Sequence, residues 1–163
     1  MKIINVMIGL PGSGKSNFCQ ENAIGDAKWV SMDALRLKML GPNDNYFSKE
    51  IMVQNAFINT IKILMQEDDY EIYIDATHIN SAARLKLLSR LPLTSDIDIY
   101  YYFFDVELRE CLRRNRRREG LARVPEGAIK NMSERAQMYI TEAEERAYHP
   151  IEFHVDEEGE ILC

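Results

Sequence analysis

The N-terminal segment constrains the fold more than any other part of the chain. Residues 2–8 (KIINVMI) form an apolar run typical of a buried β-strand, and the glycine-rich turn GLPGSGKS follows directly at residues 9–16. A helical pattern begins inside that turn and continues through residues 15–22. A strand, a tight turn and a helix in this order open a βαβ unit, so the sequence predicts an α/β protein with a mainly parallel sheet.

The turn has the pattern GxxxxGKS of a phosphate-binding loop, or P-loop, in the strand–turn–helix context that such a loop requires. Its glycines let successive backbone N–H groups point at phosphate oxygens, and the helix N-terminus adds positive potential. Lys15 would bridge the β- and γ-phosphates of ATP, and the Ser16 hydroxyl would bind Mg²⁺. The neighbouring phosphate-binding residues would be Gly12, Ser13 and Gly14. We therefore expect ATP and Mg²⁺ as ligands.

Strand and helix patterns alternate along the remainder of the chain. Short apolar runs predict further strands at residues 28–31, 71–75, 97–104 and 151–155. Helical spacing predicts helices at residues 34–40, 48–68, 80–90, 106–119 and 125–148. Together these elements predict a three-layer α/β fold with a central, mainly parallel five-stranded sheet flanked by helices.

Composition favours one globular domain, residues 1–163, since 46% of the residues are hydrophobic and 28% are charged. No apolar run approaches the ~20 residues that cross a bilayer, and the N-terminus lacks a signal-peptide layout. We therefore expect no membrane partner and a cytoplasmic location, in a host or a phage-infected cell. Cys19, Cys111 and Cys163 share no close spacing, which favours reduced thiols over a disulfide framework or a zinc site.

Positive charge is concentrated in one segment of an acidic chain. The net charge is −6, yet residues 109–123 hold seven arginines and two glutamates. Such a patch indicates a local anionic ligand. Five arginines gather at the end of an expected helix, within a lid of about residues 113–125: Arg113, Arg114, Arg116, Arg117 and Arg118. Lid arginines can stabilise a transferring phosphoryl group, and surplus ones would meet nucleic-acid phosphates or form a solvated helix face.

The candidate general base is Asp33, which follows the expected strand at residues 28–31. Ligands of open α/β sheets bind at the carboxyl ends of strands, so this carboxylate should face the same crevice as the P-loop. It could accept the proton of a hydroxyl group that attacks phosphorus. Arg36, on the same helical side, could hold an anionic part of the acceptor. A plainer alternative is an aspartate in a first helical turn that pairs with an arginine.

A second group of polar residues follows the strand expected at residues 71–75. Asp75 ends that strand as the acidic residue of a Walker B site does, and would organise Mg²⁺ through water. Thr77 would lie near the acceptor. For Asn80 we favour helix capping, and for His78 an exposed position in the turn.

At these motifs the chain resembles the kinase domain of bacteriophage and bacterial 5′-hydroxyl polynucleotide kinases, within the wider P-loop kinase group. The resemblance covers nearly the whole sequence. Its motifs are GLPGSGKS at 9–16, DxxR at 33–36, Asp75-Ala76-Thr77 with Asn80, Phe104-Asp105-Val106, Arg114-Asn115 with Arg118, and Val124-Pro125. It implies a parallel sheet flanked by helices and a tunnel from the acceptor side to the ATP phosphates.

The resemblance also implies roles for individual residues. Lys15 and Ser16 would bind phosphate and Mg²⁺, Asp33 would be the general base, and Arg36 would contact the 3′-phosphate of the acceptor. Arg118, and with it Arg114, would stabilise the ATP phosphates from the lid. Arg117 is a second candidate for the place of Arg118, because the lid is one residue longer than the family pattern.

Three functions remain open from the sequence. The first is ATP-dependent transfer of the γ-phosphate to the 5′-hydroxyl of DNA or RNA, with the nucleic-acid end and ATP as the partners. The second is a kinase for a nucleoside or small metabolite, since similar P-loop folds accept compact substrates. The third is an ATP-dependent binding or regulatory protein without acceptor chemistry.

Overall fold

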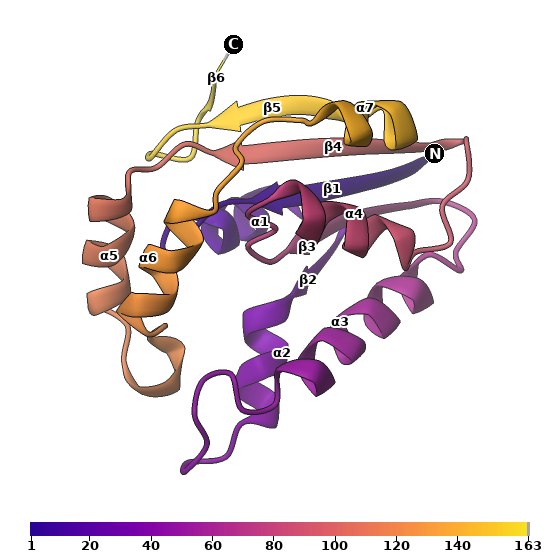
Figure 1. Ribbon diagram of the computed structural model, residues 1–163. Helices are drawn as coiled ribbons and strands as arrows, with labels where there is room; N and C mark the ends of the chain where they lie inside the picture. The colour runs from indigo at the N-terminus through magenta and orange to yellow at the C-terminus, as the bar shows by residue number, and fades with distance from the viewer. Residues whose placement is uncertain (163) are drawn as a thin grey trace.

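The computed structural model describes residues 1–162 and has three layers, a sheet with helices on both faces (Figure 1). The strands are β1 (Lys2–Ile8), β2 (Lys28–Ser31), β3 (Tyr70–Asp75), β4 (Ile97–Phe104), β5 (Ile151–Val155) and β6 (Ile161–Leu162). The α-helices are α1 (Lys15–Asn22), α2 (Met32–Met39), α3 (Glu50–Leu64), α4 (Ser81–Ser89), α5 (Leu108–Arg116), α6 (Glu126–Glu134) and α7 (Glu142–Tyr148), with a 3₁₀ turn at Gly120–Ala122.

The sheet has the strand order β2-β3-β1-β4-β5-β6, and its first five strands are parallel. β1 lies between β3 and β4, so that Val6 pairs with Ile74 on one side and Tyr101 on the other. Ser31 at the end of β2 pairs with Asp75 at the end of β3. The P-loop, α2 and the turn after β3 therefore all start from one edge of the sheet.

Apolar side chains cover both faces of the sheet. On one face α3 and α4 place Phe57, Ile61 and Leu88 over the strands, and these side chains are almost fully buried. On the opposite face α1 contributes Phe18 and Cys19. β1 is buried between these two layers, and the apolar strand thereby fixes where the P-loop leaves the sheet.

The sheet has six strands, not the expected five. Residues after β5 turn back because Asp156 accepts hydrogen bonds from the N–H groups of Glu158 and Glu160, and Gly159 adopts a positive φ of 83°. β6 then pairs antiparallel with β5. A strand of two residues carries no periodicity that the sequence could reveal.

The helix expected over residues 125–148 is wrong, since the structure has α6, an irregular segment and α7. Within that segment the carbonyl groups of Gln137 and Tyr139 accept hydrogen bonds from the Arg84 side chain. The N–H group of Gln137 binds the carbonyl of Ile79. Thr141 then starts α7 with a capping box. Hydrogen bonds to distant residues thus replace the backbone hydrogen bonds of a continuous helix, although the apolar residues have helical spacing.

Smaller differences concern boundaries and cysteines. α3 begins at Glu50 and not at Ser48, because the Ser48 hydroxyl donates to the Asn45 carbonyl in the preceding turn. Cys19 and Cys111 are buried free thiols, whereas Cys163 lies outside the described residues. Across residues 1–162, none of the helices combines the length and apolar character that crossing a membrane requires.

Candidate active site

The P-loop lies against helix α5, and this contact explains why one P-loop position must be glycine. Gly12 has a φ of 86°, and a Cβ atom at this position would approach the Cys111 carbonyl oxygen to 2.5 Å. Gly14 also has a positive φ, of 98°, and directly precedes α1. Both positions require glycine because of the backbone conformation, and Gly12 requires it for space as well.

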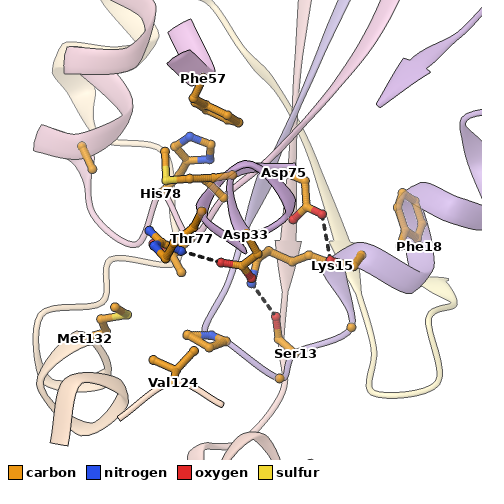
Figure 2. A pocket seen from close by; sticks show the side chains of 18 of the residues that line it. Ser13, Lys15, Phe18, Asp33, Phe57, Asp75, Thr77, His78, Val124 and Met132 are labelled. Carbon is orange, nitrogen blue, oxygen red and sulfur yellow. Dashed lines mark hydrogen bonds and ion pairs between the residues drawn. The ribbon is translucent and has the colours of Figure 1, made fainter. Parts of the chain in front are cut away.

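Lys15 reaches back over its own loop. Its Nζ donates to the carbonyl oxygens of Gly9 and Leu10 at 3.0 and 2.8 Å and lies 3.5 Å from the Ser13 hydroxyl (Figure 2). Burial lowers the pKa of this ammonium group, while the nearby carboxylates of Asp75 and Asp33 act in the opposite direction. The two carboxylates thus help to keep Lys15 positively charged. A buried positive charge in a phosphate-binding loop is suited to an anionic ligand.

Asp75 joins β3 to the P-loop. Its Oδ2 accepts hydrogen bonds from the Ser16 hydroxyl at 2.9 Å and from the Trp29 indole at 3.0 Å. Burial raises the pKa of this carboxyl, and Lys15, Trp29 and Ser16 oppose the effect. A carboxylate and a hydroxyl in contact are oxygen donors of the kind that Mg²⁺ prefers, so these two residues fit the metal that the P-loop implies.

Asp33 is held by a cluster of three side chains from α2, α3 and the loop between them. Its Oδ1 accepts from Arg36 at 2.7 Å and from the Tyr46 hydroxyl at 2.9 Å. Arg36 in turn makes a bidentate ion pair with Glu50. Burial, followed by the charge of Asp33, raises the pKa of Tyr46, which keeps its hydroxyl protonated as a donor. The carboxylate is half-exposed, and within residues 1–162 no hydrogen bond reaches its Oδ2.

Two of the lid arginines lie at the P-loop. Arg114 donates to the Gly12 carbonyl and to the Glu157 carbonyl, and Arg118 lines the same cavity. Arg117 is exposed and does not line the cavity. Arg113 and Arg116 form surface ion pairs with glutamates. For these two arginines the structure therefore agrees with the alternative of a solvated helix face.

The turn after β3 forms another part of the cavity wall. Thr77 lines the cavity, and its carbonyl accepts from the Gly9 N–H. Asn80 caps α4, as expected. The expectation of an exposed His78 is wrong: its side chain is buried, its φ is 43°, and its Nδ1 lies 2.9 Å from the Met7 carbonyl. Burial lowers the pKa of His78 to about 4, so the ring is neutral at neutral pH.

One cavity of about 700 Å³ unites these groups. The candidate residues that line it are Gly12, Ser13, Gly14, Lys15, Ser16, Asp33, Arg36, Asp75, Thr77, Arg114 and Arg118. Figure 2 shows Lys15, Asp33 and Asp75 gathered beside one another, with His78 and Phe57 further along the cavity. Its volume lies within the range of pockets that bind small molecules and cofactors.

Sequence reasoning missed three side chains that support this site, Trp29, Tyr46 and Glu50, and it expected a fourth, the buried His78, to be exposed. Trp29 is the single tryptophan of the chain and lies on a short strand four residues before Asp33. This position is only a weak indication that Trp29 belongs to the site. Tyr46 and Glu50 come from a loop and a helix start without a motif. Their importance follows from which residue each one contacts, and only the folded chain shows those contacts.

The comparisons with known proteins agree with this fold. The chain has a TM-score of 0.65 and 21% identity with a structure of the Pnkp1/Rnl/Hen1 RNA repair complex, covering 82% of this chain and 43% of that one. A fungal RNA kinase gives a TM-score of 0.61 at 16% identity, covering 94% and 38%. A sugar kinase from Janibacter sp. HTCC2649 gives 0.62 at 12% identity, covering 97% and 86%. The chain thus spans less than half the length of the first two.

The chain shares its three-layer α/β fold with these kinase structures, so the expected resemblance is confirmed at the level of the fold. The chain belongs to the AAA domain family, whose model matches residues 4–139. No curated protein matches the sequence.

Proposed function

We propose that this protein is an ATP-dependent phosphotransferase that moves the γ-phosphate of ATP to the 5′-hydroxyl of DNA or RNA. The observation that carries the proposal is the position of Asp33. Its free Oδ2 shares one cavity with the P-loop and with Arg114 and Arg118. A protein that only binds ATP has no need of an oriented carboxylate in the cavity beside the P-loop and the lid.

The proposed mechanism is an in-line attack in which each residue has one task. Asp33 orients the acceptor hydroxyl through Oδ2 and takes its proton as the oxygen attacks phosphorus. Lys15 leaves the carbonyl groups of its own loop and binds the β- and γ-phosphate oxygens. Arg118 and Arg114 stabilise the charge of the transferring group from the lid. The bond to the leaving ADP oxygen breaks as the new ester bond forms.

Ser16, with Asp75 behind it, would hold Mg²⁺. When bound, this ion neutralises charge on the phosphate oxygens. Trp29 donates to Asp75 and thereby holds its carboxylate toward Ser16. These contacts keep both oxygen donors at the start of α1, next to the phosphate-binding N–H groups.

The acceptor class rests on the resemblance and on two neighbours, an RNA repair complex and a fungal RNA kinase. The second candidate is a kinase for a nucleoside or small metabolite. It is favoured by a deoxyadenosine kinase from M. mycoides at TM-score 0.55 and 15% identity, covering 95% of this chain and 91% of that one. That enzyme and the sugar kinase match this chain over nearly their whole length.

The discriminating experiment is transfer of labelled γ-phosphate from ATP to three acceptors: a 5′-hydroxyl oligonucleotide, a 3′-nucleotide and a panel of nucleosides and sugars. We expect strong labelling of the oligonucleotide. If only the small acceptors were labelled, the proposed acceptor class would be wrong and the proposed mechanism would still stand. Tight ATP binding with no acceptor-dependent ADP formation would favour the binding or regulatory protein.

Replacing Lys15 by methionine is expected to lower the turnover number by about 10²-fold, because the variant keeps the apolar stem and loses the charge that meets the phosphates. Steady-state kinetics with saturating acceptor measure the effect. Lys28→Met, on an exposed strand position outside the cavity, is the matched control. A Lys15→Met enzyme with the turnover of the control would remove Lys15 from the mechanism.

Tyr46→Phe tests whether the cluster around Asp33 positions the base. The change removes the hydrogen bond from the Tyr46 hydroxyl to Oδ1 and the one that this hydroxyl accepts from Arg36. It keeps the ring, whose centroid lies 4.5 Å from the Arg36 guanidinium group. A hydrogen bond is worth about 0.5–1.5 kcal/mol, so we expect turnover to fall about 2- to 10-fold. The KM for ATP should stay unchanged, which a general loss of structure would not allow. Tyr100→Phe, away from the cavity, should have wild-type kinetics.

A further inference from the structure

The anionic part of a nucleic-acid acceptor needs a cation that is free to meet it, and Arg36 is already engaged. All three of its guanidinium nitrogens have partners: Nε and Nη2 donate to Glu50, and Nη1 donates to Asp33 and the Tyr46 hydroxyl. Two carboxylates surround this one guanidinium group, so the cluster carries a net negative charge. An approaching phosphate would have to displace a bidentate ion pair.

Six basic side chains line the cavity in the described part of the chain: Lys15, Arg36, Lys86, Arg90, Arg114 and Arg118. Lys15, Arg114 and Arg118 belong to the P-loop and the lid, where ATP would bind. With Arg36 engaged, Lys86 and Arg90 remain. Both come from the α4 region, on the wall away from the lid.

Lys86 and Arg90 are placed to act together. They are four residues apart, so they lie on one face at the end of α4. Lys86 is exposed, and within residues 1–162 no carboxylate forms an ion pair with either side chain. Arg90 uses one Nη2 donor on the amide oxygen of Asn55 in α3, at 3.0 Å, and its other donors are unused. This contact joins the facing sides of α3 and α4.

We infer that Lys86 and Arg90 bind phosphate groups of a polynucleotide acceptor beyond its first nucleotide. The inference rests on the proposed function and names the surface that would select a strand over a compact acceptor. With the 5′-hydroxyl at Asp33, the strand leaves the cavity between α3 and α4 and passes these two cations. Contacts of this kind bind the backbone without reading its sequence.

The test compares acceptors of different length in a Lys86→Ala/Arg90→Ala enzyme. For a 5′-hydroxyl decanucleotide we expect KM to rise about 10-fold, with the salt dependence of binding reduced by roughly one unit of slope per cation removed. For a 3′-mononucleotide we expect an unchanged KM. Lys62→Ala/Arg135→Ala removes two exposed cations away from the cavity and serves as the control of equal charge.

Two results would overturn the inference. One is a decanucleotide KM equal to that of the control, and the other is an equal rise in KM for both acceptors. If the double variant is too unstable to assay, Lys86→Glu alone serves instead, because it leaves the Arg90–Asn55 contact intact. It should also raise KM for the decanucleotide and leave KM for the mononucleotide unchanged. If the wild-type enzyme phosphorylates the decanucleotide while the variants behave as the control, the inference fails and the proposed function stands. A wild-type enzyme that phosphorylates no polynucleotide overturns both.

Discussion

Replacing Asp33 by asparagine is expected to lower the rate of phosphoryl transfer by about 10²- to 10⁴-fold, the usual contribution of a general base. The substitution is nearly isosteric. The Oδ1 of asparagine can still accept from Arg36 and Tyr46, as the carboxylate does in the structure. The second position then becomes an NH₂ group, which donates to the acceptor hydroxyl where a carboxylate oxygen would accept its proton.

Single-turnover transfer to a 5′-hydroxyl oligonucleotide measures this loss, and equilibrium titration measures ATP affinity, which should stay close to the wild-type value. The matched control is Asp26→Asn, since Asp26 is exposed in a turn and does not line the cavity. If Asp33→Asn transfers phosphate as fast as Asp26→Asn, another group activates the acceptor and the proposed mechanism is wrong.

Glu144→Ala is expected to cost about 3–5 kcal/mol of the free energy of unfolding, because it leaves a fully buried guanidinium group without its counter-charge. Arg84 and Glu144 are both completely buried and form two parallel hydrogen bonds of 2.9 Å. Burial by itself would raise the pKa of Glu144, but the hydrogen bonds and the charge of Arg84, together with neighbouring hydroxyl groups, lower the pKa overall. The carboxylate is therefore charged at neutral pH.

Urea unfolding measures the loss, and Glu142→Ala provides the control. Glu142 lies in the same helix and pairs with Arg146, but both of these side chains are exposed, so the substitution should change stability little. Equal stabilities of Glu144→Ala and Glu142→Ala would show that the buried pair does not support the fold.

This ion pair also bears on the site. Arg84 binds the carbonyl of His78 in the turn that follows β3, as well as the carbonyls of Gln137 and Tyr139. One side chain thus fastens a wall of the cavity to the segment between α6 and α7. We expect Glu144→Ala to weaken activity as a consequence of disorder in this wall, with loss of activity and loss of stability appearing together on heating.

Local patterns were sufficient for the βαβ opening, the P-loop and most of the parallel strands. The apolar run of β1 and the glycines that follow it act over a few residues, so their structure depends little on the rest of the chain. The cap of α4 at Asn80 is equally local. Asp75 ends a parallel strand and Asp33 closely follows another, so both could be placed near the P-loop, because parallel strands end at one edge of the sheet.

Contacts between distant residues decided the rest. The break between α6 and α7 exists because Arg84, more than fifty residues away, binds carbonyl groups that a helix would otherwise use. Arg36 could be predicted near Asp33, but its bidentate partner Glu50 and its neighbour Tyr46 have no sequence signature. A sequence pattern reports the energetics of neighbouring residues, whereas hydrogen-bond partners far along the chain are chosen only when packing brings them together.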